Sequence, residues 1–122
     1  MAPEMIAGRG YGKSVDWWSF GSLVFEMLTG LPPFYSQDVQ LMYRRIVEDR
    51  LAFPPYVSET ARGLISLLLE KDPARRICDP ELIKRHPFFD EIDWNDLYRR
   101  KVKPPYVPDV VNININIYNI FI

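Results

Sequence analysis

The fold is decided by one strongly apolar stretch, DWWSFGSLVFEML, at residues 16–28. Read as a helix, it places apolar side chains around nearly the whole circumference instead of along one stripe. A helix of that kind must be buried on most of its sides. Gly30 can adopt the left-handed conformation that ends a helix, and Pro32 and Pro33 prevent the helix from continuing beyond it. The sequence therefore predicts a central buried helix that begins at Asp16 and ends before Gly30.

The segments around this helix predict shorter helices joined by proline-rich connectors. Val39, Met42 and Ile46 recur at helical spacing and indicate one buried face. Ser58 and Asp79 are typical helix N-caps. The predicted elements are a loop at 1–14, helices near 36–49, 58–72, 79–86 and 93–98, and an extended connector at 51–56. Since nothing before residue 110 alternates as a strand does, the predicted fold class is all-α.

The C-terminal part differs in kind from the rest. Residues 103–108, KPPYVP, cannot form regular structure and are expected to be an extended proline-rich tail. Residues 111–122 alternate asparagine and isoleucine, the pattern of a two-faced strand, yet the chain offers no sheet for it to join. If exposed, the segment would be an aggregation hazard. We interpret it as disordered or as a gene-model artefact, such as translated non-coding sequence rich in A and T.

Composition excludes several classes of protein and site. The 122 residues suffice for one domain and carry a formal net charge of -1 without a basic block, which argues against a nucleic-acid partner. With Cys78 the single cysteine and His86 the single histidine, neither an intrachain disulfide nor a thiolate zinc site is expected. No apolar run reaches the ~18–20 residues of a membrane span, and no signal peptide is recognisable. A reducing compartment, cytoplasmic or nuclear, is expected.

Five motifs follow one another along the chain: APE at residues 2–4, DWWSFG at 16–21, GLPPF at 30–34, KDPARR at 71–76 and HPFF at 86–89. Together they resemble the C-terminal half of the large lobe of a eukaryotic protein kinase, where Ala-Pro-Glu closes the activation segment. The resemblance implies that residues 1–89 form the helical C-terminal subdomain of a protein-kinase-like fold.

A sixth motif narrows the resemblance. IDWNDL at residues 92–97, followed by the proline-rich tail, is similar to the start of the C-terminal tail of the AGC group, the serine/threonine kinases related to protein kinases A, G and C. Residues 90–110 are therefore expected to be the beginning of that tail.

The resemblance implies structural roles for four residues. In the family, the Ala-Pro-Glu carboxylate is buried and paired with an arginine, and Glu4 and Arg76 match these positions. Trp18 is expected to pack over this pair; the alternative is an unrelated, exposed Glu and Arg. Asp16 matches an aspartate that hydrogen-bonds the catalytic loop of the family. Because that loop is not in this sequence, the role left for Asp16 is a helix N-cap.

Glu26 is the candidate substrate-binding residue. It is the only charge between Trp17 and Leu28, where a carboxylate is costly unless something compensates it. By resemblance, Glu26 matches the glutamate that contacts a basic residue just N-terminal to the phosphorylated Ser or Thr of a protein substrate. The alternative is an acid at the rim of the helix with a structural partner.

The sequence has no counterpart of the parts that transfer phosphate in the family. It contains no Val-Ala-Ile-Lys lysine, no His-Arg-Asp loop and no Asp-Phe-Gly motif, and the glycines near residues 8–12 have the wrong spacing for a phosphate-binding loop. No catalytic, cofactor-binding or metal-binding residue is therefore assigned. ATP and Mg²⁺ are expected only in a full-length parent, and the chain alone is expected to be inactive. Whether it counts as an enzyme stays open.

Both ends are expected to be interrupted, since Met1 falls where the family often has the hydrophobic residue before Ala-Pro-Glu. The expected partners are the N-terminal half of the kinase domain and a protein substrate with basic residues. Lacking half of its cover, the isolated chain is expected to be helical, loosely packed and prone to aggregate. Two alternatives remain: a non-catalytic interaction module that uses residues 36–49 and the proline-rich tail, and an unrelated helical domain with accidental motifs.

Overall fold

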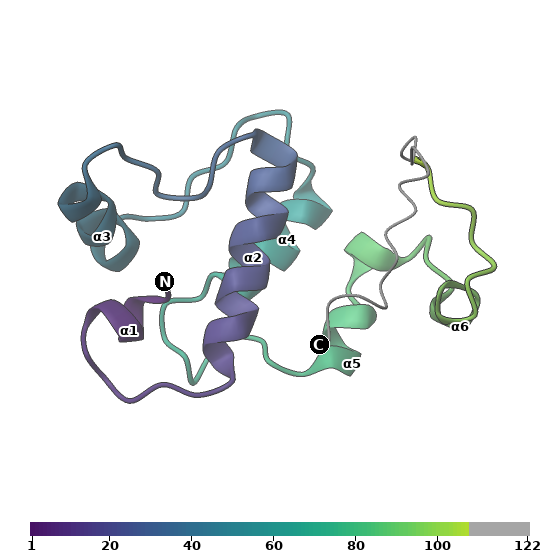
Figure 1. Ribbon diagram of the computed structural model, residues 1–122, viewed down its shortest axis with the longest axis horizontal. Helices are drawn as coiled ribbons and strands as arrows, with labels where there is room; N and C mark the ends of the chain where they lie inside the picture. Colours follow the sequence, from purple (N-terminus) through teal and green to yellow (C-terminus); the bar gives the residue numbers. More distant parts are fainter. Residues whose placement is uncertain (108–122) are drawn as a thin grey trace, which may run out of the picture. The chain divides into compact units, whose positions relative to one another are not determined.

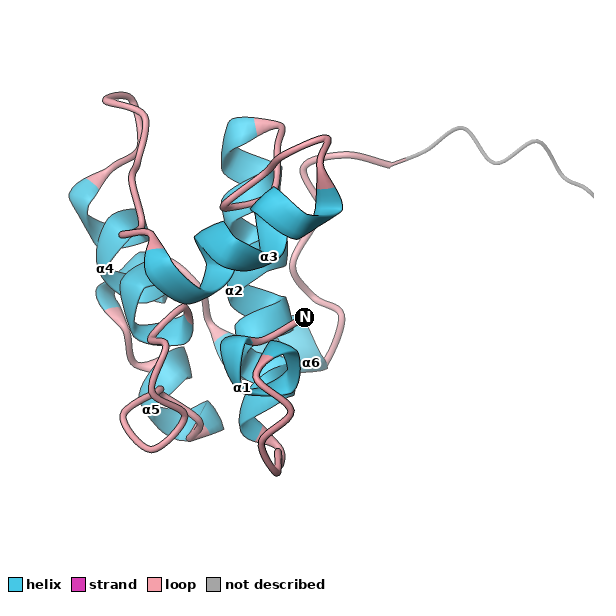
Figure 2. Cartoon of the chain, turned by 90° about the vertical axis from the view of Figure 1, so that its left-hand side faces the viewer, coloured by secondary structure: helices cyan, strands magenta, loops and turns pink. Residues whose placement is uncertain are grey.

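The computed structural model describes residues 1–107, and Figure 1 shows their course. The elements are α1 (Pro3–Ile6), α2 (Ser14–Thr29), α3 (Val39–Glu48), α4 (Glu59–Leu68), α5 (Pro80–Lys84), the 3-10 turn η1 (Pro87–Phe89) and α6 (Trp94–Tyr98). Every regular element among the described residues is a helix, as Figure 2 shows, and the predicted all-α class is confirmed. The interpretation of residues 111–122 falls outside the described part of the chain.

The chain divides into two compact units. The first, Met1–Glu91, contains α1 to α5 and η1, and the second begins at Ile92 and contains α6. In the second unit, Asp93 caps α6 by accepting a hydrogen bond from the Asp96 amide at 2.9 Å. Within residues 1–107, no helix combines the length and the hydropathy that a membrane span requires.

The central helix α2 ends where the sequence predicts and begins earlier. Gly30 closes it in the left-handed conformation, with φ of 83° and an amide that donates to the Glu26 carbonyl at 2.7 Å. The helix starts at Ser14, with Lys13 at the N-cap position. Asp16 therefore lies exposed inside the first turn, where a carboxylate suits the helix dipole. Its carboxylate accepts no hydrogen bond within residues 1–107, so the N-cap interpretation of Asp16 is wrong.

The core of the first unit lies where α2 packs against α4. Leu64, Ile65 and Leu68 of α4 are completely buried there. Gly21 of α2 is buried at the contact, and a Cβ atom added to it would lie 2.7 Å from the Cβ atom of Leu68. The missing side chain of Gly21 is therefore what lets the two helices approach so closely.

The opposite face of α2 is uncovered. Trp18, Val24 and Phe25 are buried, whereas Leu23 is 54% exposed and Met27 is 75% exposed. α2 thus has the composition of a helix buried on most sides, but in this chain it lacks part of that cover, as expected for the isolated chain. The physical reason is that no element of the unit Met1–Glu91 lies over that face, although its residues have the composition of a buried surface.

The expectation of a loop throughout residues 1–14 is also wrong in part, because α1 occupies four of these positions. Pro3 takes the first helical position, where its fixed φ suits a helix and its missing N–H costs nothing. The Ala7 amide closes the turn on the Pro3 carbonyl at 2.9 Å. α1 also packs against α3, a tertiary contact that the local glycine-rich sequence gives no sign of.

Side-chain caps set the start of the next three helices. Asp38 Oδ1 accepts from the Gln40 amide at 2.8 Å and thereby starts α3 later than the predicted residue 36. The predicted caps Ser58 and Asp79 are confirmed, since their side chains accept amide hydrogen bonds within α4 and α5.

Candidate functional site

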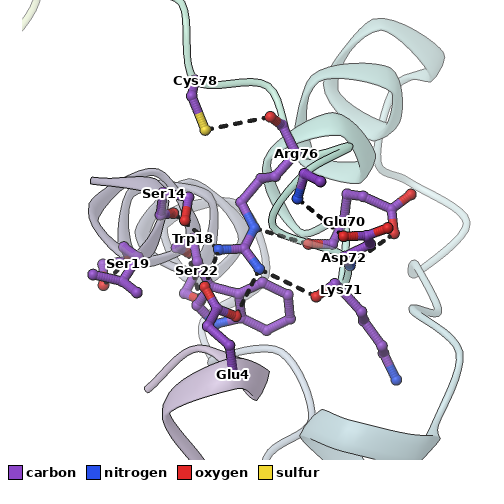
Figure 3. A network of polar contacts seen from close by, with 12 residues as sticks. Glu4, Ser14, Trp18, Ser19, Ser22, Glu70, Lys71, Asp72, Arg76 and Cys78 are labelled. Atoms are coloured by element: carbon purple, nitrogen blue, oxygen red, sulfur yellow. Dashed lines mark hydrogen bonds and ion pairs between the residues drawn. The ribbon is translucent and has the colours of Figure 1, made fainter. Parts of the chain in front are cut away.

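The most deeply buried polar group of the first unit is an ion pair between Glu4 and Arg76. Arg76 Nη1 lies 2.7 Å from Glu4 Oε1, and Nη2 lies 2.9 Å from Oε2, so the two side chains meet as parallel forks (Figure 3). The exposed fractions of the side chains are 0% for Arg76 and 3% for Glu4. The pair joins α1 to the loop after α4, across 72 positions of sequence.

The remaining donors of Arg76 are also satisfied. Nε donates to the Glu70 carbonyl at 2.8 Å, and Nη1 donates to the Ser14 carbonyl at 3.0 Å. Among residues 1–107 no buried side-chain nitrogen or oxygen lacks a hydrogen-bond partner. Arg76 thus holds together α1, the first residue of α2 and the segment that follows α4.

Trp18 lies against this pair. The guanidinium carbon of Arg76 is 5.1 Å from the centre of the Trp18 ring, within the range of a cation–π contact. Trp18 is 2% exposed, so its ring shields the ion pair from solvent. The hydrogen bonds with Arg76 lower the pKa of the Glu4 carboxyl below its ordinary value of 4.5, although burial acts in the opposite direction.

Glu26 lies in the penultimate turn of α2 and is exposed. Its carboxylate has neither an ion-pair partner nor a hydrogen bond within residues 1–107, and exposure removes the desolvation cost expected from its apolar sequence surroundings. Leu23, three positions earlier on the same face, is also exposed. The side chain is therefore free to contact a group from another molecule or segment.

The structure brings Glu4, Arg76 and Trp18 together but keeps Glu26 apart from them. Glu26 follows Trp18 by eight residues on the same helix, which corresponds to about 12 Å along the axis. The chain thus carries two separate features, a buried structural pair near the start of α2 and an exposed carboxylate near its end.

The described residues contain no cluster of potential metal ligands. Mg²⁺ takes oxygen ligands, typically carboxylates together with substrate phosphates. Yet no group of three His, Cys, Asp or Glu side chains between residues 1 and 107 is placed to hold a metal ion.

Comparison with known proteins identifies the family to which this fold belongs. Residues 1–89 match the family model described as Protein kinase domain. The chain belongs to the protein kinase family. The hypothesis of an unrelated helical domain with accidental motifs is therefore wrong. The described helices correspond to the C-terminal part of a protein kinase domain.

Similar proteins place this kinase segment in the AGC group. It is 60% identical over 110 residues to a RAC family serine/threonine-protein kinase homolog of Dictyostelium discoideum, covering 90% of this chain and 25% of that protein. It is 48% identical to the serine/threonine-protein kinase gad8 of Schizosaccharomyces pombe, covering 90% and 20%. It is 45% identical to ribosomal protein S6 kinase 2 alpha of Gallus gallus, covering 90% and 15%. The chain spans a quarter or less of the length of these relatives.

Two residues of this kinase segment were missed by sequence reasoning although both lie in quoted motifs. Phe34 has a φ of 62°, which is rare for a bulky side chain, and its ring stacks on Trp18. Lys71 places its ammonium 5.3 Å from the centre of the Phe34 ring. The sequence GLPPF indicates a tight turn, but it does not predict which of its residues takes the left-handed conformation.

Proposed function

We propose that this chain supplies large-lobe structure and part of the substrate-docking surface of an AGC serine/threonine kinase that prefers protein targets with basic residues. The parent enzyme would use ATP and Mg²⁺ bound by segments other than residues 1–107. The single observation that carries the docking role is the exposed carboxylate of Glu26, which has no partner within the described residues. Family membership supports phosphate transfer to proteins as the reaction, and the Glu26 carboxylate supports the preference for targets with basic residues.

The role of Glu26 rests on charge complementarity. A guanidinium can offer two parallel N–H donors to a carboxylate, and such hydrogen bonds are stronger than neutral ones. The face of α2 around Glu26 is apolar and exposed, so a peptide lying on it would exclude water from the ion pair. The residue also stands apart from the buried Glu4–Arg76 pair, and substitution there should leave the fold intact.

Replacement of Glu26 by glutamine in the complete kinase should weaken the preference for arginine. A hydrogen bond to a charged group contributes about 1.5–3 kcal/mol. The native kinase should therefore have a higher kcat/KM for a peptide with arginine than for the same peptide with norleucine, and in the variant this ratio should fall about tenfold to a hundredfold. The exposed Glu59→Gln, at the start of α4, is the matched control and should leave the ratio unchanged. An unaltered ratio in the Glu26 variant would remove this role.

The chain on its own should not transfer phosphate. Purified protein incubated with ATP, Mg²⁺ and an arginine-bearing peptide should incorporate no phosphate above a blank, because no group that orients ATP or accepts the hydroxyl proton has been identified in it. The Arg76→Met variant, purified in the same way, controls for a contaminating kinase. Incorporation by the native chain that disappears in this variant would contradict the proposed inactivity.

The uncovered face of α2 supports the preceding part of the kinase domain as a partner. Leu23 and Met27 carry the apolar surface of a buried helix and are exposed in this chain. The same surface would serve the second candidate function, a non-catalytic interaction module. Mixing the chain with the N-terminal part of the kinase domain separates the two: recovered phosphate transfer favours the kinase, and a stable complex without transfer favours the module.

A further inference from the structure

Two stacked aromatic rings of the first unit each face a cation. The rings of Trp18 and Phe34 lie 6.3 Å apart between centroids, with 10° between their planes. Arg76 faces the Trp18 ring at 5.1 Å, and Lys71 faces the Phe34 ring at 5.3 Å. Arg76 already has a full set of partners in the ion pair with Glu4, whereas no role has been assigned to Lys71.

The Lys71 ammonium also reaches the C-terminal end of α3. Its Nζ donates to the Val47 carbonyl at 3.0 Å and to the Asp49 carbonyl. The last carbonyls of a helix lack partners within the helix, and a cation is favoured there by the dipole. Burial lowers the pKa of Lys71, and the neighbouring carboxylates of Asp49 and Glu48 oppose that shift.

Besides Lys71, this end of α3 is held chiefly by Arg45, whose Nη1 donates to the Tyr35 carbonyl at 2.6 Å, while the helix also contacts α1. Ile46 is its only buried residue, whereas α4 buries four residues of its ten. Phe34, on the other side of the ammonium, keeps a left-handed backbone conformation that persists only where the surroundings hold it. One ammonium therefore connects a weakly packed helix to a strained turn.

Phe34 and α3 also form walls of two neighbouring grooves. One, of about 310 Å³, is lined by Phe25, Phe34 and Arg45 among others. The other, of about 230 Å³, is lined by Trp18, Phe34 and Tyr43 among others. Any movement of α3 away from Phe34 would change both grooves together.

We propose that Lys71 is a positioning residue whose charge latches the C-terminal end of α3 onto the Trp18–Phe34 pair. When this charge is lost, the end of α3 detaches and both grooves open, while the core between α2 and α4 stays folded. This latch does not depend on the proposed docking role of Glu26, because it concerns contacts within the first unit only.

Hydrogen exchange of the full chain tests the latch. In Lys71→Met, the amides of residues 46–49 should exchange at least about tenfold faster, while those of α4 change less than about twofold, because local opening need not involve the core. The Asp49 amide, which donates to the Arg45 carbonyl at 2.9 Å, is a suitable reporter. Lys84→Met removes a lysine whose ion pair with Glu81 is exposed, and should change neither helix.

A second variant separates charge from hydrogen bonding. Lys71→Gln keeps N–H donors but carries no charge, and it should match Lys71→Met. Native exchange in the glutamine variant would overturn the role of the charge. Unchanged exchange at residues 46–49 in Lys71→Met, or equal acceleration of α3 and α4, would overturn the latch itself.

Discussion

Replacement of Arg76 by methionine should abolish most of the stability of the first unit. The substitution leaves the Glu4 carboxylate buried without its partner, and breaking one side of a buried pair costs about 3–5 kcal/mol. The total stability of a domain is about 5–15 kcal/mol, and the uncovered face of α2 places this chain at the low end of that range. Urea unfolding of the full chain, followed by far-UV circular dichroism, measures the loss.

Two controls separate the buried charge from a general effect of mutation. The double variant Glu4→Leu with Arg76→Met removes both charges and should recover much of the lost stability, because no unpaired charge remains buried. Lys84→Ala removes an exposed partner of Glu81 and should cost at most about 0.5 kcal/mol. An Arg76→Met variant as stable as Lys84→Ala would contradict the structural role of the pair.

Lowering the pH should remove the stability contributed by the Glu4–Arg76 ion pair, because acid protonates the Glu4 carboxylate. Hydrogen bonding to Arg76 lowers the pKa of Glu4 in the folded chain below its ordinary value of 4.5, so the unfolded chain binds the proton more readily. The contribution of Glu4 to stability is therefore fully present above pH 4.5 and is lost as the pH falls through the lowered pKa. Comparing the urea midpoints of the native chain and Glu4→Gln across this range should show their difference shrinking with acid.

Replacement of Gly21 by alanine should destabilise the chain, although alanine favours helices by about 1 kcal/mol over glycine. The added Cβ atom would lie 2.7 Å from Leu68 Cβ and 3.1 Å from Leu69 Cδ2, so α2 and α4 must separate. Such overpacking costs about 1–3 kcal/mol. Because the closest atom is a Cβ, shortening Leu68 to alanine would not relieve the contact. Thermal unfolding of the full chain measures the net effect.

Gly63, inside α4, provides the matched control. A Cβ atom added there meets only the His86 ring, at 3.4 Å from Nε2, which is an ordinary contact. Gly63→Ala should therefore stabilise the chain by about 0.5–1 kcal/mol, the helix propensity gain alone. If Gly21→Ala stabilises the chain as much as Gly63→Ala does, the close packing of α2 on α4 is not as described.

Features that depend on a few neighbouring residues could be predicted from the sequence. Gly30 ends α2, and Ser58 and Asp79 cap their helices, because a stop or a cap is made with groups within about four positions. The ordered motifs also determined the family, since a family resemblance is carried by residue types and their order along the chain.

Features that join distant segments could not be predicted in this way, because they depend on how the helices pack. These features are the helical turn of α1, the exposed face of α2 and the start of α2 ahead of Asp16. They also include the position of Lys71 between Phe34 and the end of α3. Lys71 is 22 positions from Asp49, and no local pattern encodes a contact of that separation. Composition states which side chains favour burial, but whether another element is present to bury them depends on the packing of the whole fold.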